Sequence, residues 1–246
     1  MDKVVAAIRQ ARNIIMVTGA GISTSCGIPD FRSPDGLYAR LKVDYPSLPQ
    51  PEAMFDMRYF LQNPRPFFDF AKEIWPGLFQ PSPSHKFVKA LETRGQLRRD
   101  YTQNIDTLEQ VAGISNIVQC HGSFNTASCI LCKHQVTKEA IRDQVFAGQI
   151  PLCPNHICSD TLLHHRVPVL KPDITFFRED LPQTFYEHLE SDLDVCDLVI
   201  VMGSSLQVQP VSRIPDVVDD SVPQILINRE PLRHAEFSAE LLGSCD

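Results

Sequence analysis

Short apolar runs recur along the chain, and each ends in a polar tip of small or functional residues. The runs are Ile14–Val17, Ile117–Val118, Asp197–Met202 and Ile225–Ile227. Runs without polar alternation indicate strands that are buried on both faces, as in a parallel sheet. The amphipathic stretches that predict covering helices are residues 2–12, 84–94 and 181–193. The sequence therefore predicts an open α/β fold, a parallel sheet with helices on both faces that binds ligands at the carboxyl ends of its strands.

Two segments interrupt this alternation of strands and helices. Residues 44–83 are rich in proline and phenylalanine and predict short helices packed over the sheet as a lid. From about residue 128 to residue 166, cysteines and histidines replace the apolar periodicity. A segment with so poor a core needs another source of stability, and a bound metal is the obvious one.

Four cysteines in the second segment have the spacing of a structural zinc site. Cys129 and Cys132 form a Cys-x-x-Cys pair, which places two thiolates on one turn, and Cys153 and Cys158 follow. The second pair is irregular, since His156 stands at the usual spacing and Cys158 lies two residues further. We predict Cys158 as the fourth ligand, because thiolate sets are commoner in such sites, and keep His156 as the alternative. Four protein ligands leave no open position, so this zinc would hold structure and perform no chemistry.

Composition narrows the classes of function. A net charge of -7 argues against nucleic acid as the main ligand, because binding a phosphate backbone calls for a basic face. The same charge is compatible with a cationic partner, such as a lysine-rich protein segment. Eight cysteines are too few for a disulfide scaffold in 246 residues, which favours a reducing, intracellular compartment. No run approaches the roughly 20 apolar residues of a membrane span, so we expect neither a membrane partner nor a signal peptide.

The first polar tip is rich in glycine. Gly19 and Gly21 follow a predicted strand, as in loops that hold phosphates. The next glycine, Gly27, stands six residues after Gly21, where the dehydrogenase fingerprint has it three after, so the usual dinucleotide motif fits poorly. An acid, an aromatic ring and a guanidinium follow at the same edge, namely Asp30, Phe31 and Arg32. These groups suit a carboxamide, a sugar or ring, and a phosphate respectively.

Two further tips carry groups suited to catalysis. Gln103, Asn104 and Asp106 suit ribose hydroxyls and amides, and a helix cap explains one of them but not all three. His121 stands beside a glycine at the end of another predicted strand. Because an imidazole exchanges protons readily near neutral pH, His121 is the histidine best placed for proton transfer.

Taken together, these motifs resemble those of the sirtuin family across nearly the whole chain. Besides the cysteines, the shared motifs are Gly19-Ala-Gly-Ile-Ser23, Gly27-Ile-Pro-Asp-Phe-Arg32, Thr102-Gln-Asn-Ile-Asp106, His121-Gly122, Lys171-Pro-Asp173, Gly203-Ser-Ser-Leu206 and Ile227-Asn-Arg-Glu230. Residues 101–113 and 223–232 look most similar to the family's class I branch. The resemblance implies a Rossmann-like NAD-binding domain, a small zinc-bearing domain, and a cleft between them for NAD and an acyl-lysine peptide.

The resemblance also implies domain ranges and site residues. The NAD-binding domain would comprise residues 1–39, 84–127 and 167–246, with a helical lid segment of the small domain at 40–83 and a zinc-binding module at 128–166. His121 and Asn104 would be the catalytic residues. The family's cofactor positions fall on Gly19, Ala20, Gly21, Asp30, Phe31, Arg32, Gln103, Asn104, Ile105, Asp106, Gly203, Ser204, Ser205, Asn228, Glu230 and Cys245.

In that family the acyl oxygen attacks the ribose carbon of NAD as nicotinamide leaves, and the histidine deprotonates a ribose hydroxyl so that the acyl group moves to ADP-ribose. The resemblance thus implies an NAD-dependent protein lysine deacetylase. Its substrates would be acyl-lysine proteins, including histones and other nuclear proteins, and its place the nucleus, with the cytoplasm as the alternative. We expect an uncharged acyl group, since the lid has no pairing of Tyr and Arg that would select an acidic one.

Arg178 departs from the family pattern, which has a glycine at this position. A glycine lets two backbones approach closely, so we expect Arg178 either to hinder the peptide or to change its preferred sequence. Two other functions stay open: an NAD-consuming ADP-ribosyltransferase or glycohydrolase that uses the same cleft, and a catalytically weak module that binds NAD or acyl-lysine. A zinc hydrolase is disfavoured, because the chain has no histidine-carboxylate zinc motif.

Overall fold

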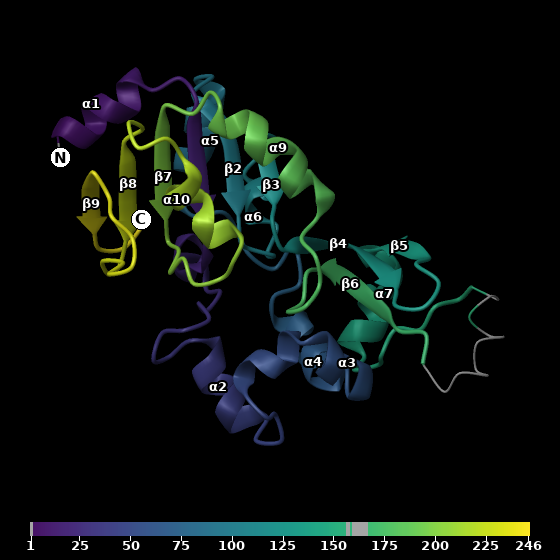
Figure 1. Ribbon diagram of the computed structural model, residues 1–246. Helices are drawn as coiled ribbons and strands as arrows, with labels where there is room; N and C mark the ends of the chain where they lie inside the picture. Colours follow the sequence, from purple (N-terminus) through teal and green to yellow (C-terminus); the bar gives the residue numbers. More distant parts are fainter. Residues whose placement is uncertain (1, 156–157, 159–166) are drawn as a thin grey trace.

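The computed structural model describes residues 2–155, 158 and 167–246, which fold into two lobes (Figure 1). One lobe is built on a sheet of six strands in the order β3-β2-β1-β7-β8-β9, which we call the large sheet. The other contains an antiparallel sheet of three strands in the order β5-β4-β6, the small sheet. No helix within these described ranges is long and apolar enough to cross a membrane.

Every strand pairing in the large sheet is parallel. Its strands are β1 (Ile14–Thr18), β2 (Leu97–Thr102), β3 (Ile117–Gln119), β7 (Leu198–Met202), β8 (Gln224–Asn228) and β9 (Ala239–Leu242). The helical segments of this lobe are α1 (Asp2–Gln10), η1 (Ala20–Ile22), η2 (Thr24–Cys26), α5 (Pro83–Thr93), α6 (Leu108–Val111), α9 (Gln183–Leu193), η5 (Val211–Arg213) and α10 (Ile214–Val217). The predicted parallel sheet is confirmed, with the four apolar runs in β1, β3, β7 and β8.

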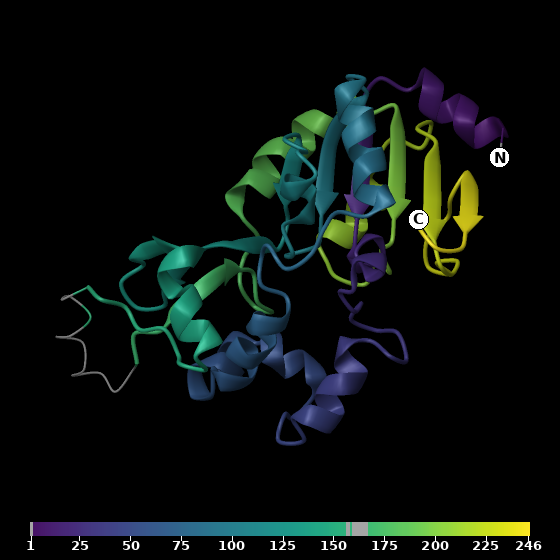
Figure 2. The same ribbon diagram turned by 180° about the vertical axis from the view of Figure 1, so that it is seen from behind.

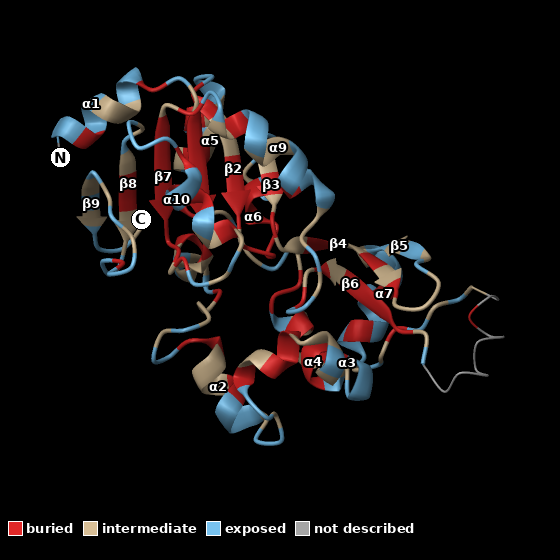
Figure 3. Ribbon diagram, viewed as in Figure 1, coloured by how far each residue is buried: buried red, intermediate tan, exposed pale blue. Residues whose placement is uncertain are grey.

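The central strand β1 contributes to a separate core on each face of the large sheet. Successive side chains of a strand point to opposite faces. Ile14 and Met16 pack with residues of α1 and α5, whereas Ile15 and Val17 pack with residues of α9 and α10. Figures 1 and 2 view the sheet from opposite sides and show α9 in front of it in one view and α5 in the other. The central strands are buried between these helices, as Figure 3 shows.

Sequence reasoning gave no strand at β2, because Arg98, Arg99 and Asp100 interrupt its apolar pattern. The structure pairs both guanidinium groups with Asp192 of α9, a carboxylate that is fully buried. The hydroxyl of Tyr101 donates a third hydrogen bond to Asp192 at 2.8 Å. A charged strand therefore lies inside the sheet because a helix distant in sequence supplies the counter-charge.

The second lobe joins the proline- and phenylalanine-rich segment to the cysteine-rich one. Its elements are α2 (Leu37–Asp44), η3 (Pro51–Phe55), α3 (Met57–Gln62), α4 (Arg65–Glu73), β4 (Gly122–Cys129), β5 (Gln135–Thr137), α7 (Lys138–Phe146) and β6 (Leu170–Ile174). The predicted short helices are present, but they pack against the small sheet and not over the large one.

One aromatic cluster is the core of the second lobe. The ring of Phe67 contacts those of Phe60, Phe124 and Phe176 at centroid distances of 5.6, 6.4 and 5.0 Å. Ile141 and Val145 of α7 are buried in the same cluster. The expectation that residues 128–166 lack a core was therefore incomplete, because α7 shares the apolar core of a segment distant in sequence.

The pairing of β6 bears on the division into domains. This strand lies within residues 167–246, which the sequence assigned to the NAD-binding domain, yet it pairs with β4 in the small sheet. The domain ranges stay a prediction, and this pairing favours a boundary after β6.

Candidate functional site

A cleft of about 550 Å³ lies at the carboxyl ends of the large-sheet strands and extends to the second lobe. It brings together most of the residues that the sequence predicted for the site: Gly19, Ala20, Gly21, Asp30, Phe31, Arg32, Gln103, Asn104, Ile105, His121, Gly203, Ser204, Ser205, Asn228, Glu230 and Cys245. Asp106 is the exception, since it lines a smaller cavity that shares Ala20, Phe31, Asn104 and Ile105 with the cleft.

Two glycine-bearing tips form part of the cleft wall by close backbone contact. A Cβ atom added to Gly21 would lie 2.6 Å from the Cα of Gly203, so no other residue fits without a shift of the backbone. Gly203 itself has φ +64, a conformation that favours glycine. The amide of Gly21 donates to the carbonyl of Gly203 at 2.8 Å. This part of the wall is therefore backbone, which allows a ligand to approach closely.

The Asp30-Phe31-Arg32 loop is held by its own carboxylate. One oxygen of Asp30 accepts from the amides of Arg32 and Ser33, and the other accepts from the hydroxyl of Ser33. Phe31 packs edge-on against Tyr38 at 5.7 Å, and the guanidinium of Arg32 lies 5.6 Å from the centre of the same ring. Asp30 thus organises the loop, a role that sequence reasoning missed.

Asn104 lines the cleft and is held by the tip that follows β1 and by the end of its own strand β2. Its Nδ2 donates to the carbonyl of Gly19 at 3.2 Å and to the hydroxyl of Ser23 at 3.3 Å. Its amide donates to the hydroxyl of Thr102 at 3.1 Å. The hydroxyl of Ser23 donates in turn to the carboxylate of Asp106 at 2.7 Å. Asp106 therefore acts from behind the cleft, because it orients the serine that positions Asn104.

His121 lies where β3 of the large sheet leads into β4 of the small sheet. Its Nδ1 lies 3.0 Å from the carbonyl oxygen of Gln103. A carbonyl only accepts, so Nδ1 carries the proton and Nε2 carries the lone pair. This Nε2 is buried and has no hydrogen-bond partner among the residues that the structure describes.

Burial lowers the pKa of His121, and the hydrogen bond to Gln103 opposes this effect. The imidazole is therefore neutral at pH 7, with a lone pair that is able to take a proton from a ligand in the cleft.

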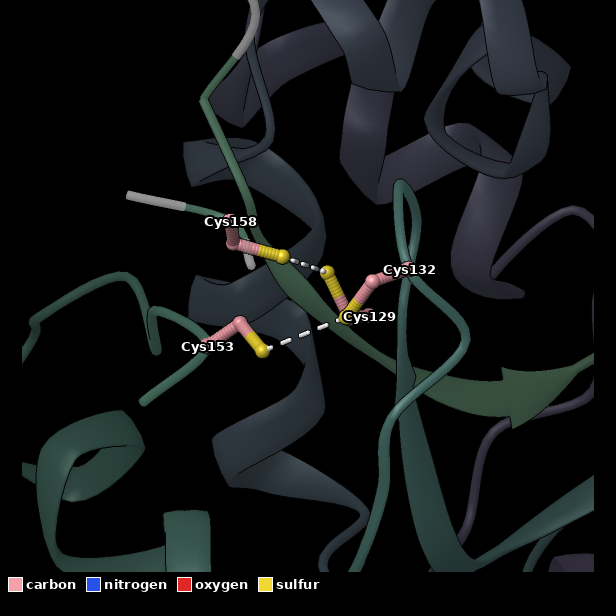
Figure 4. Close-up of side chains that lie close together, drawn as sticks. All are labelled: Cys129, Cys132, Cys153 and Cys158. Carbon is pink, nitrogen blue, oxygen red and sulfur yellow. Dashed lines mark hydrogen bonds between the residues drawn. The ribbon is translucent and has the colours of Figure 1, made fainter. Parts of the chain in front are cut away.

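Four cysteine side chains meet in the second lobe, where Figure 4 shows them turned toward one another. The Sγ atoms of Cys129 and Cys158 lie 3.5 Å apart, and those of Cys132 and Cys153 lie 3.7 Å apart. Sulfur atoms around a tetrahedral zinc, each at ~2.3 Å, would be separated by about 3.8 Å. The donor set thus fits zinc and includes Cys158 as predicted. His156, the alternative ligand, lies outside the described residues.

Comparison with known proteins agrees with this geometry. The sequence model of the Sir2 family matches residues 19–210. The chain belongs to the Sir2 family. A solved structure described as "Structural Basis for the Mechanism and Regulation of Sir2 Enzymes" superposes with a TM-score of 0.85 at 29% identity, covering 99% of this chain and 92% of that one.

Curated Sir2 relatives share more than half of the residues of this chain. Rattus norvegicus "NAD-dependent protein deacetylase sirtuin-1" is 55% identical over 246 residues, which is 100% of this chain and 43% of the relative. The protein of the same name from Homo sapiens is 55% identical, and the match covers 32% of its length. Drosophila melanogaster "NAD-dependent histone deacetylase sirtuin-1" is 52% identical, again over 32% of its length. The predicted resemblance to the sirtuin family is thus confirmed, although this chain spans less than half of each of these relatives.

Several parts of this Sir2 cleft, apart from Arg178, were not predicted as site residues from the sequence. Residues 174–177, 179, 207–209, 243 and 244 all line it. Lys171 stabilises the first of these segments, since its ammonium lies 3.0 Å from the carboxylate of Glu179, which also accepts from the amide of Phe176 at 2.8 Å. The Lys171-Pro-Asp173 motif was the signal available for this segment, but the sequence does not show that a lysine would hold the turn that follows.

Proposed function

We propose that this Sir2 chain is an NAD-dependent protein lysine deacylase, which transfers the acyl group of a lysine side chain to ADP-ribose with release of nicotinamide. The single observation that carries the proposal is the Nε2 atom of His121. It is a buried lone pair on a neutral imidazole at the wall of a cleft, with no partner among the described residues. Such an atom is placed to accept a proton from a bound ligand.

The residues of the cleft fit NAD. The backbone wall at Gly21 and Gly203 leaves room for a pyrophosphate to approach closely, and Arg32 supplies a positive charge on the same cleft. Gln103 links two strand tips, because its Nε2 donates to the hydroxyl of Ser204 at 2.7 Å. When bound, NAD would supply a ribose carbon that becomes reactive as nicotinamide leaves.

The roles of the chain's own residues follow from their contacts. His121 would take a proton at Nε2 from a ribose hydroxyl, while the carbonyl of Gln103 keeps the proton on Nδ1. Asn104, fixed through its amide nitrogen, would orient the ligand with its side-chain oxygen. The rings of Phe31 and Phe176 line the cleft and would exclude water that competes with the acyl oxygen.

We assign zinc a structural role in the second lobe. The four thiolates Cys129, Cys132, Cys153 and Cys158 would fill its coordination sphere and hold the end of β4 against the segment around residue 153. The division into an NAD-binding domain and a zinc-bearing domain is part of the same proposal.

The substrates we propose are acetyl-lysine or other uncharged acyl-lysine residues on proteins. Histones are one class, since a Drosophila relative carries histone deacetylase in its name. Such substrates would place the protein in the nucleus, with the cytoplasm as the alternative. The net charge of -7 is compatible with lysine-rich protein segments and disfavours direct binding of nucleic acid.

The deciding experiment incubates the purified chain with an acetyl-lysine peptide, with and without NAD, and identifies the products by mass spectrometry. We expect NAD-dependent loss of acetyl together with nicotinamide and acetyl-ADP-ribose. NAD consumed with the acetyl group retained would instead indicate an ADP-ribosyltransferase or glycohydrolase. Binding without consumption of either compound would indicate a binding module.

A pair of histidine variants tests the role of His121. His121→Ala should abolish turnover and lower the free energy of unfolding by only about 1 kcal/mol, because it removes the hydrogen bond from Nδ1 to the carbonyl of Gln103 while no described residue depends on Nε2. The control is His188→Ala, on α9 and outside the cleft, which should keep full activity. Full turnover by His121→Ala would remove His121 from the mechanism.

A further inference from the structure

Arg178 occupies a backbone position that suits glycine. The amide of Glu179 donates to the carbonyl of Phe176 at 3.0 Å, which closes a four-residue turn. Arg178 is the third residue of this turn and has φ +77. That geometry corresponds to a type II turn, in which the third residue is usually glycine or asparagine. An arginine therefore stands at a backbone position that prefers glycine, which indicates that the Arg178 side chain makes a stabilising contact of its own.

The contact that holds the Arg178 side chain is with the second lobe. Its Nε lies 3.0 Å from one carboxylate oxygen of Asp56, while the other oxygen accepts from the amides of Arg58 and Tyr59 at the start of α3. The backbone joins the same segments, since the amide of Phe177 donates to the carbonyl of Phe55 at 2.8 Å. The arginine is thus fixed in direction, although its side chain remains 59% exposed.

This fixed arginine lines the cleft that contains His121. The amide of Thr175 donates to the carbonyl of His121 at 2.8 Å, so the segment that leads to Arg178 lies directly against the proposed base. Arg178 lies three positions after Thr175, a reach of at most about 10 Å along the chain. Residues that flank an acyl-lysine directed at His121 would therefore pass within reach of the guanidinium.

Arg178 presents an exposed guanidinium at this point of the wall, although its Nε is paired with Asp56. Asp56 contacts only Nε, and the two terminal nitrogens of Arg178 make no hydrogen bond within the described part of the chain. The adjacent carboxylate of Glu179 is engaged by Lys171 and by the amide of Phe176. The terminal nitrogens of Arg178 are thus available to an incoming carboxylate, for which a guanidinium is well suited.

We propose that Arg178 is a specificity-determining residue, which selects protein segments that carry an acidic side chain within two residues of the acyl-lysine. The inference rests on the proposed function for the identity of the substrate. An exposed guanidinium and a carboxylate in contact favour such a segment by about fivefold over a neutral one, and a lysine at the same place is disfavoured to a similar extent. The preference declines as ionic strength rises, because the arginine is exposed.

The test uses three acetyl-lysine peptides that differ only at the two positions beside the acetyl-lysine on each side, which carry glutamate, glutamine or lysine. Dissociation constants are measured by fluorescence anisotropy and kcat/KM by mass spectrometry. The result is the ratio between peptides within one variant, so that a general loss of activity cancels. We expect the wild type to favour the glutamate peptide over the glutamine peptide about fivefold at low salt.

Three variants separate charge from backbone effects. Arg178→Asn, which tolerates positive φ, should lose the preference, and Arg178→Lys should keep most of it. Asp56→Asn retains a good cap for α3 and removes the competing carboxylate, so it should strengthen the preference.

Equal ratios in wild type and Arg178→Asn would overturn the proposal, as would a preference for the lysine peptide. Binding in the order glutamate, glutamine and lysine peptide without any deacetylation would leave the inference about Arg178 standing and refute the proposed activity. Deacetylation of all three peptides at equal rates would support the proposed activity and overturn the inference about Arg178. Failure of every peptide to bind would overturn both.

Discussion

The substitution Gly122→Ala tests the close contact between β4 and β6 of the small sheet, beside His121. Gly122 begins β4 with φ +67 and pairs with Ile174 of β6. A Cβ atom at this position would lie 2.0 Å from the carbonyl oxygen of Asp173 and 3.2 Å from the Cα of Ile174. Both are backbone atoms, so the overlap is relieved only if β4 and β6 move apart.

Gly95→Ala is the matched control, since Gly95 has φ +68 and nothing lies within 4 Å of its added Cβ. We expect Gly95→Ala to destabilise the fold by ~1 kcal/mol, which is the conformational term alone. Gly122→Ala carries the same term and an overlap of roughly 2 kcal/mol or more, as in overpacked cores, so its total is about 3 kcal/mol. The difference between the two variants isolates the steric contact.

Urea unfolding followed by circular dichroism measures both values, and the slope with urea checks that the transition stays two-state. Deacetylation at a temperature where both variants are folded provides the second readout. We expect Gly122→Ala to lose activity beyond its loss of stability, because the shift moves His121. Equal destabilisation by the two variants would show that the strands yield freely at this point and would refute the argument.

Three further predictions concern the large sheet and the zinc site. Asp192→Ala should lower the free energy of unfolding by about 3 kcal/mol in a urea titration, because it leaves two guanidinium groups and a phenol without their buried acceptor. The control is Asp194→Ala, at an exposed position of the chain, which should change the free energy of unfolding by less than about 0.5 kcal/mol. Burial raises the pKa of Asp100 from 3.8 to about 7, so the folded state binds more protons and stability falls as pH rises through that window. Asp100→Asn lacks this loss and should gain stability relative to wild type as the pH rises from 4 to 8 in thermal melts, and parallel pH profiles would contradict the burial argument. Cys129→Ser should release zinc, measured by elemental analysis, and lower the melting temperature, while Cys26→Ser should keep the metal; a stable, metal-free Cys129→Ser protein would sink the zinc assignment.

The sequence predicted those parts of the fold in which one segment determines its own environment. The run Ile14–Val17 is apolar on both faces and becomes the central strand, and Cys129 and Cys132 are neighbours whose spacing alone predicts a metal site. The strand at Arg98 could not be predicted in the same way, because its stability depends on Asp192, which lies more than ninety residues away. The place of β6 in the small sheet is a long-range pairing of the same kind.

The candidate site shows the same limit. Polar tips at the ends of parallel strands must meet at one edge, so His121 and Asn104 were expected near each other. The contacts that set their chemistry, such as the hydrogen bond from Nδ1 of His121 to the carbonyl of Gln103, depend on exact loop positions. The sequence also identified Arg178 as a departure without indicating its partner, because Asp56 lies 122 residues earlier in the chain.

The position of His121 between the lobes has a consequence for the mechanism. Its ring is held by the large-sheet lobe, through Nδ1 and the carbonyl of Gln103 at 3.0 Å, whereas its carbonyl is held by the second lobe, through the amide of Thr175 at 2.8 Å. A change in the angle between the lobes would therefore alter the direction of Nε2 relative to the cleft. The ion pair between Arg178 and Asp56 lies on the same segment of the chain, three positions after Thr175. A segment that binds Arg178 would thus act on the wall that positions the proposed base, so that the proposed selection of the substrate and the alignment of His121 would share one structural element.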